Sequence, residues 1–188
     1  MNSAKVQNEG EKEMRKQQKG FSLIELLIVV AIILIIAAIA IPNLMRAKIA
    51  ANDSSAAGSE RSIVTGEIGY YAAYPTIGYA ASLVTLGGAL GVPCVPSTTT
   101  ACFLDSTLAN DGNPANSGKS GYKFAATPIA PTATTPAEFW TTGTPLGTTS
   151  GSKAYCATDD GVIRTQAAGV ITLVADYPTC EGLGALAN

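Results

Sequence analysis

Residues 21–41 read FSLIELLIVVAIILIIAAIAI, an apolar run of 21 residues that only Ser22 and Glu25 interrupt. As an α-helix this run would be roughly 32 Å long, enough to cross a hydrocarbon core of about 30 Å. Basic residues stand before it at Arg15, Lys16 and Lys19. This modest positive bias favours an orientation with the N-terminal end in the cytoplasm and the remainder of the chain across the membrane.

Two ordinary interpretations of this segment compete. An ordinary secretory signal would end in an A-x-A cleavage site, which Ala38-Ile39-Ala40 supplies, and a plain membrane anchor needs no site at all. Neither interpretation explains Glu25, because an ionised carboxylate at the centre of a spanning helix costs about 2.5–3.5 kcal/mol on insertion scales and less near an interface. Glu25 therefore calls for a partner.

The residues KGFSLIELLIVV at positions 19–30 resemble the cleavage and methylation motif of type IV prepilins and their secretion-system relatives. Pro42 falls where that family places a helix-kinking proline. The resemblance implies that a membrane peptidase cuts between Gly20 and Phe21 and N-methylates Phe21. Residues 1–20 would then be a cleaved leader, and residues 21–41 the helix that spans the membrane and later forms the filament core.

Physical reasoning gives Glu25 a role consistent with this resemblance. Cleavage would create an amino group at Phe21, one helical turn from Glu25 and on the same face. In a bundle of packed helices, Glu25 of one subunit could meet the amine of a neighbour. At ~4 Å and an effective dielectric of ~20, their attraction is on the order of 4 kcal/mol before desolvation. The carboxylate would be costly in lipid and satisfied in a fibre, which favours assembly.

A second helical stretch is expected over residues 42–74. Pro42 lacks an N–H and clashes with the carbonyl of Ala38, so the helix should bend or open there, and Pro75 disfavours helix at the residue before it. Asp53, Glu60 and Glu67 repeat every seven residues. We interpret this acidic row (Asp53, Glu60 and Glu67) as a solvated edge, and the sequence leaves open which face of the helix meets a sheet.

The remaining sequence predicts a long connecting region followed by a β-sheet. Residues 75–121 are rich in Gly, Pro, Ser and Thr. Residues 122–188 contain strand patterns, with a D-G turn at Asp160-Gly161 between two of them. The candidate strands are 122–125, 138–142, 153–157, 162–165 and, as one more possibility, 170–175. The expected fold class is α+β, with a long N-terminal helix packed on an antiparallel sheet of about four strands.

Four cysteines allow three pairings. Export of the C-terminal body favours two disulfides over four buried free thiols. Cys94 and Cys102 enclose a short turn-rich loop, and a Cys156–Cys180 bridge would tie the chain end to the sheet. The crossed pairings would fold a long flexible region onto the sheet, so Cys94–Cys102 and Cys156–Cys180 are the favoured pairs.

Composition argues against catalysis, metal binding and nucleic-acid binding. The 188 residues include no histidine, which removes the commonest general base and metal ligand. Past residue 20 the chain has 7 Lys/Arg and 11 Asp/Glu, a net charge of −4, which gives no footprint for nucleic acid. The pair Asp159 and Asp160 is explained by a hairpin turn. We expect no enzyme activity, no cofactor and no metal.

The most direct functional hypothesis is a structural subunit of an extracellular type IV pilus. The resemblance implies these partners: copies of the same chain, a prepilin peptidase, an inner-membrane assembly machine and the inner membrane that holds the precursor. Adhesion and surface motility are among the family's roles, and nothing here chooses between them. The alternatives are a pseudopilin of a type II secretion system, a minor pilin, and a membrane-tethered binding protein that never polymerises.

Overall fold

The computed structural model describes residues 21–112 and 114–186. One long helix, α1 (Leu23–Ala73), comes first, and Pro42 lies inside it. The chain divides between Ile41 and Pro42 into an N-terminal segment and a compact unit, residues 42–188, which we call the head. The bend expected at Pro42 stays a prediction.

The sheet has five antiparallel strands in the order β1-β2-β3-β4-β5, each paired with the next along the chain. The strands are β1 (Tyr122–Ile129), β2 (Glu138–Pro145), β3 (Tyr155–Thr158), β4 (Ile163–Thr165) and β5 (Gly184–Ala185). The fold is therefore α+β, a long apolar helix followed by an antiparallel sheet, as the sequence predicts. The fifth strand has only two residues and pairs with Arg164 and Thr165 at the end of the meander.

The expected strand at 170–175 is wrong. This stretch forms no strand, and it is followed by a short helix, α4 (Tyr177–Glu181). Asp176 caps α4 by accepting a hydrogen bond from the Thr179 N–H at 2.9 Å, and Pro178 lies in the first turn, where its missing N–H does no harm. Only Val174 of the expected strand is buried in the core, against Cys156 and Cys180.

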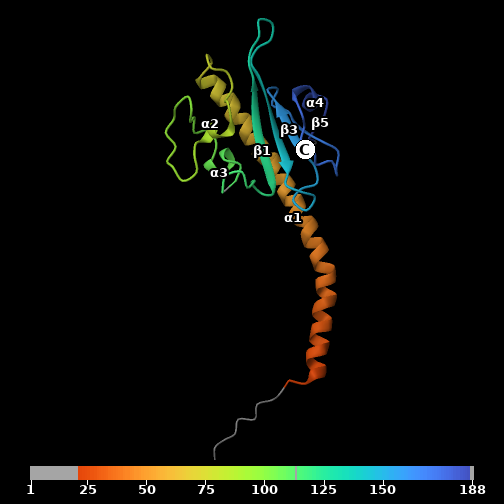
Figure 1. Cartoon of the computed structure of the whole chain (residues 1–188). Helices are drawn as coiled ribbons and strands as arrows, with labels where there is room; N and C mark the ends of the chain where they lie inside the picture. The colour runs from red at the N-terminus through yellow and green to blue at the C-terminus, as the bar shows by residue number, and fades with distance from the viewer. Residues whose placement is uncertain (1–20, 113, 187–188) are drawn as a thin grey trace, which may run out of the picture. The chain divides into compact units, whose positions relative to one another are not determined.

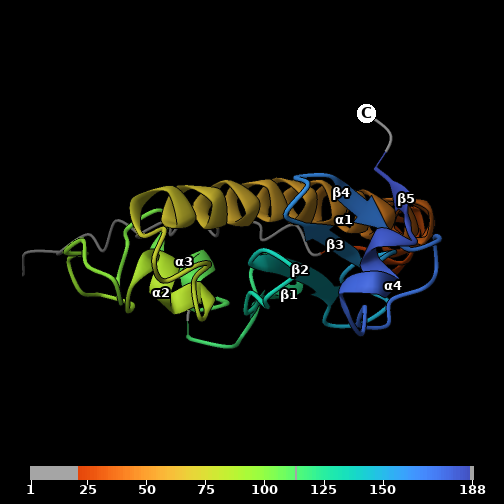
Figure 2. The same ribbon diagram turned by 90° about the horizontal axis from the view of Figure 1, so that it is seen from above.

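Residues 75–121, expected as a connecting region, also contribute to the core. They contain α2 (Leu83–Gly87) and α3 (Ser106–Ala109), which lie on the same side of α1 as the sheet (Figure 1, Figure 2). The two short helices approach closely at Gly87, where an added Cβ would lie 2.6 Å from the Cβ of Ala109. Leu86 and Leu108 are almost fully buried and belong to the main core.

The head's main core joins one face of α1 to the sheet. Large buried rings come from the strands and from Tyr70 of the helix, and the helix adds the small and branched side chains of Ala56, Ala57, Ile63 and Val64, which repeat every seven residues. The principal members are Ala56, Ile63, Tyr70, Tyr122, Phe124, Phe139 and Tyr155. Phe139 and Tyr122 are fully buried, so the inward faces of β1 and β2 are the faces that cover α1.

Candidate functional site: an exposed apolar helix and a buried acidic row

The N-terminal part of α1 leaves its apolar side chains uncovered. Every residue from 21 to 41 is exposed except the half-buried Ala37, and the exposed fractions of Leu23, Ile24 and Ile39 are 80%, 65% and 66%. The mean hydropathy of its most apolar window is 3.3, and by length and composition this is a helix that could cross a membrane. A surface of this kind needs lipid or other protein to cover it.

Glu25 stands in the first turn of α1, exposed among apolar neighbours. The helix begins two residues after Phe21, with the Leu26 N–H donating to the Ser22 carbonyl at 3.2 Å. Gly20, on the leader side of the expected cleavage, lies outside the described residues. A carboxylate at this end of a helix is favoured by the unpaired N–H groups of the first turn. Whether Phe21 carries a free or methylated amine stays a prediction.

The acidic row is the largest departure from expectation in the head. The interpretation of a solvated edge is wrong, because Glu60 and Glu67 are both 0% exposed and Asp53 is half-buried. The row faces the core because it shares one side of α1 with Ala56, Ile63 and Tyr70. Burial of carboxylates against a sheet is unusual unless they are paired or protonated.

Each acid of the row holds a different part of the head. Asp53 accepts hydrogen bonds from the Tyr122 hydroxyl at 2.5 Å and from the Ser152 N–H at 3.0 Å. Glu60 accepts from the Thr141 hydroxyl of β2 at 2.5 Å. Glu67 accepts from the Ala80 N–H at 2.8 Å. The row thus connects α1 to the loop before β3, to the sheet and to the turn that follows the helix.

The partners of the row could not be recognised from the sequence. Ser152 is 99 positions from Asp53, and Thr141 is 81 from Glu60. No motif marks a single serine or threonine as the partner of a distant carboxylate. One signal was available, since Glu60 lies four residues after Ala56 and three before Ile63, on the same stripe of the helix.

The structure joins Cys94 to Cys102 and Cys156 to Cys180. The Cα atoms lie 5.8 Å and 6.0 Å apart, within the ordinary range for disulfides. The first bridge closes the loop after α2. The second ties α4 to β3, and both of its sulfurs are buried, with Val174 packed against them.

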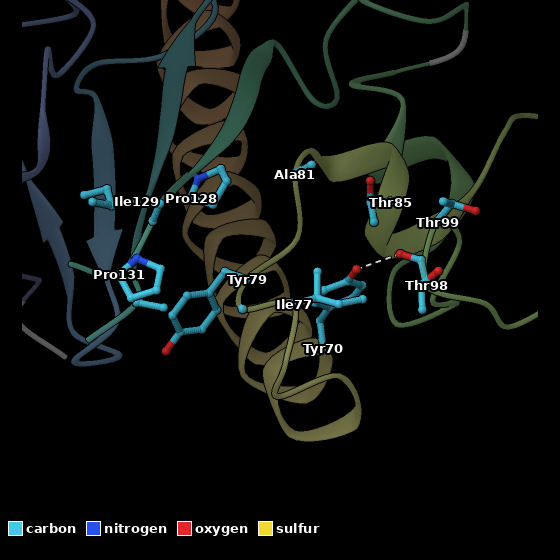
Figure 3. A pocket seen from close by; sticks show the side chains of 13 residues that line it. Tyr70, Ile77, Tyr79, Ala81, Thr85, Thr98, Thr99, Pro128, Ile129 and Pro131 are labelled. Carbon is cyan, nitrogen blue, oxygen red and sulfur yellow. Dashed lines mark hydrogen bonds between the residues drawn. The ribbon is translucent and has the colours of Figure 1, made fainter. Parts of the chain in front are cut away.

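A pocket of about 490 Å³ lies between the α2 region and the end of the β1–β2 hairpin where the chain turns from β1 to β2 (Figure 3). Tyr70, Tyr79 and Ile77 line one part of it, and Pro128 and Pro131 line another. The Tyr70 hydroxyl is engaged, since it donates to the Thr98 carbonyl at 2.6 Å. No carboxylate, amine or thiol lines this pocket, so its hydroxyl groups have no neighbouring base to activate them.

The remaining candidate carboxylates have structural partners. Asp160 forms an ion pair with Arg164, and the guanidinium holds the pKa of Asp160 at about 2. Asp159 accepts a hydrogen bond from the Tyr177 hydroxyl at 2.6 Å. Within residues 21–112 and 114–186, no three His, Cys, Asp or Glu side chains come together in a way that could hold a metal ion.

Comparison with known proteins identifies the N-terminal segment. Residues 15–41 match the family model described as the prokaryotic N-terminal methylation motif. A stretch of 39 residues is 62% identical to the type IV wide pilus major component PilA4 of Thermus thermophilus. That match covers 21% of this chain and 30% of the relative, so the chain spans less than a third of the relative's length. No solved structure matches the chain. The chain therefore carries a prokaryotic N-terminal methylation motif, and a short stretch of it is similar to a component of a type IV pilus.

Proposed function

We propose that this chain is a structural subunit of an extracellular type IV pilus, cut after Gly20 and polymerised through its N-terminal helix. The observation that carries the proposal is the exposed apolar surface of residues 21–41 with a single carboxylate in its first turn. The methylation motif and the pilus relative support the same conclusion. Before assembly the inner membrane would cover this surface, and in the fibre other copies would.

The free energy gained by covering the exposed apolar side chains of residues 21–41 can be estimated. Fully burying one Leu, Ile or Val side chain is worth about 1.5–3 kcal/mol relative to water. Lipid already removes these side chains from water, so replacing lipid by neighbouring helices adds little further hydrophobic free energy. The preference for the fibre must therefore come from packing and from polar groups, and Glu25 is the only charged side chain in residues 21–41.

Pairing of Glu25 with the Phe21 amine of a neighbour would supply that preference. The amine exists only after cleavage at Gly20–Phe21, so processing would make the segment able to assemble. A prepilin peptidase and an inner-membrane assembly machine are the partners that this route requires. The head would remain on the far side of the membrane, where oxidising conditions allow Cys94–Cys102 and Cys156–Cys180 to form.

Shearing cells and analysing the filament fraction tests the proposal. We expect the mature chain in long surface fibres, with N-methylated Phe21 as its first residue by mass spectrometry. A chain that starts at Ile41 would instead show secretory cleavage after Ala40 and overturn the proposal. A correctly cut chain that stays in the envelope would favour a pseudopilin or a non-polymerising tether.

Substitution of Glu25 tests the pairing itself. Glu25→Gln keeps the size of the side chain and removes its charge, so we expect normal membrane insertion and a large loss of fibre. Ser22→Ala is the matched control, because it removes the segment's other polar side chain without changing charge, and it should assemble normally. Normal fibres built from Glu25→Gln alone would refute the pairing.

A further inference from the structure

The acidic row contains three carboxylates on one face of α1, yet their surroundings differ. Asp53 is half-buried, whereas Glu60 and Glu67 are 0% exposed. Ionised carboxylates removed from water are stable only when hydrogen-bond donors or cations replace the lost hydration. The donors around each member therefore indicate which form of the acid the head accommodates.

Asp53 has a hydrogen-bond donor on each of its two oxygens. One oxygen accepts from the Ser152 N–H at 3.0 Å and the other from the Ser152 hydroxyl at 2.5 Å. The Tyr122 hydroxyl also lies 2.5 Å from Asp53, and its single hydrogen is shared with the Lys153 carbonyl at 2.9 Å. Donors on both oxygens are what a carboxylate needs away from water. Asp53 thus serves as an internal reference for the other two acids of the row.

Glu60 has a single hydrogen-bond donor, which is too few for an ionised carboxylate with two buried oxygens. The Thr141 hydroxyl is 2.5 Å from Oε2 of Glu60 and 3.5 Å from the Ala157 carbonyl, so one hydrogen faces two acceptors. Oε1 has no hydrogen-bond partner and lies against Gly143, where an added Cβ would be 2.7 Å away. A proton on Oε2 resolves the shortage, because Glu60 then donates to Thr141 and Thr141 donates to Ala157.

Glu67 shows the same shortage at the end of the helix. Its Oε2 accepts from the Ala80 N–H at 2.8 Å, and its Oε1 has no partner. Tyr70 and Tyr79 are titratable groups beside it. Burial is the main cause that raises the pKa of each; Tyr74 and then Glu67 add to it at Tyr70, and Asp159, Tyr71 and then Glu67 add to it at Tyr79. An unpaired oxygen of a neutral acid costs far less to bury than one that shares a negative charge.

Among the described residues, the elements packed on α1 place no cation that affects the pKa of Glu60 or Glu67. The pKa of Glu60 is affected only by burial and by the Thr141 hydrogen bond, and that of Glu67 only by burial and the Ala80 hydrogen bond. Charged side chains of the surrounding loops and strands face other groups: Lys119 faces Ser59, Lys123 faces Asp111, Lys153 faces Tyr155, and Asp159 and Glu138 face Tyr177.

We infer that Glu60 and Glu67 are two proton-binding sites of the head, which folds with both as neutral carboxylic acids and loosens on α1 when they ionise. Burial raises the pKa of each from 4.5 to about 7, in agreement with the geometry. Since the folded pKa lies above the unfolded one, the contribution of Glu60 and Glu67 to stability is greatest below pH 4.5, falls as the pH rises to about 7, and is then constant. The contacts affected join α1 to Thr141 of β2 and to the turn at Ala80.

Infrared titration of the mature full-length chain in non-ionic detergent tests this inference directly. We expect a carbonyl band of protonated carboxylic acid at pH 6 that disappears with a midpoint near 7. Glu60→Gln and Glu67→Gln should each remove part of the band. A wild-type chain without such a band at pH 6 overturns the inference, and this measurement needs no variant to fold.

Unfolding measurements give the second arm of the test. A pKa change from 4.5 to about 7 implies that the unfolding equilibrium constant rises on the order of 10²-fold per carboxyl between pH 4.5 and 8. The Glu60→Gln/Glu67→Gln double variant should lose this dependence. Asp53→Asn is the matched control, since it should lower stability at every pH and keep the slope. An unchanged slope in the double variant would also overturn the inference.

Discussion

Removing the Cys156–Cys180 bridge should destabilise the head more than removing Cys94–Cys102. The Cys156–Cys180 bridge spans 24 positions and the Cys94–Cys102 bridge spans 8. Loop-closure entropy in the unfolded chain predicts a loss of about 3.5 kcal/mol in the free energy of unfolding for the longer loop. The same model predicts about 2.5 kcal/mol for the shorter one. The difference of about 1 kcal/mol favours the bridge to β3 as the stronger constraint.

Folded-state contacts should widen this difference. Cys156 and Cys180 are both 0% exposed and pack with Val174, so alanine at both positions also leaves a small cavity. The helix that Cys180 belongs to, α4, has only five residues, too few to be stable without tertiary contacts. We therefore expect the segment from Val174 to Leu183 to detach in the Cys156→Ala/Cys180→Ala variant.

Denaturation in guanidinium chloride, followed by fluorescence of Trp140, measures the effect. Trp140 is the only tryptophan and belongs to β2, so its signal reports the sheet. A loss of about 3.5 kcal/mol should lower the midpoint by about 1 M for a slope of about 3–4 kcal/mol per M. The matched variant is Cys94→Ala/Cys102→Ala. A larger loss in that variant would refute the reasoning from loop length and from burial together.

Two further predictions concern the head. Gly151→Ala should lower the free energy of unfolding by about 1–3 kcal/mol, because the new Cβ would clash with the Tyr122 hydroxyl that donates to Asp53. Gly147→Ala is the control: open space surrounds this position, so the change in the same denaturation assay should be less than about 0.5 kcal/mol. Asp160 should titrate with a pKa of about 2 by NMR. Its pairing with Arg164 therefore stabilises the head above pH 3.8, and this stabilisation is lost as the pH falls through 2. In Arg164→Ala the pKa of Asp160 should return toward 3.8, and an unchanged pKa would contradict the assigned cause.

The elements with strong local patterns could be predicted from sequence. The apolar run at 21–41 needs no tertiary information, because length and hydropathy alone predict a helix that could cross a membrane. The same holds for the hairpin around Asp160-Gly161, where Gly161 has a φ of +76° and β3 and β4 pair on either side. In both cases the deciding residues are neighbours in the sequence.

Patterns that depend on distant partners could not be predicted. Residues 170–175 are rich in β-branched side chains, but the strand that pairs with β4 comes from Gly184 and Ala185 instead. The acidic row was misassigned for a related reason. Helical spacing shows that Asp53, Glu60 and Glu67 share a face, but only Ser152, Thr141 and Ala80 show that this face is covered.

Carboxylates on α1 meet the cost of leaving water in three different ways. Asp53 accepts hydrogen bonds on both of its oxygens, from Tyr122 and Ser152. Glu60 and Glu67 lack donors, and we infer that they keep a proton. Glu25 lies exposed in the apolar segment, where we propose that an amine from another subunit supplies the missing charge. An amine partner attracts the ionised acid, while burial alone favours the neutral one. Acidification toward pH 5 should therefore strengthen the contacts that Glu60 and Glu67 make with β2 and with the turn at Ala80.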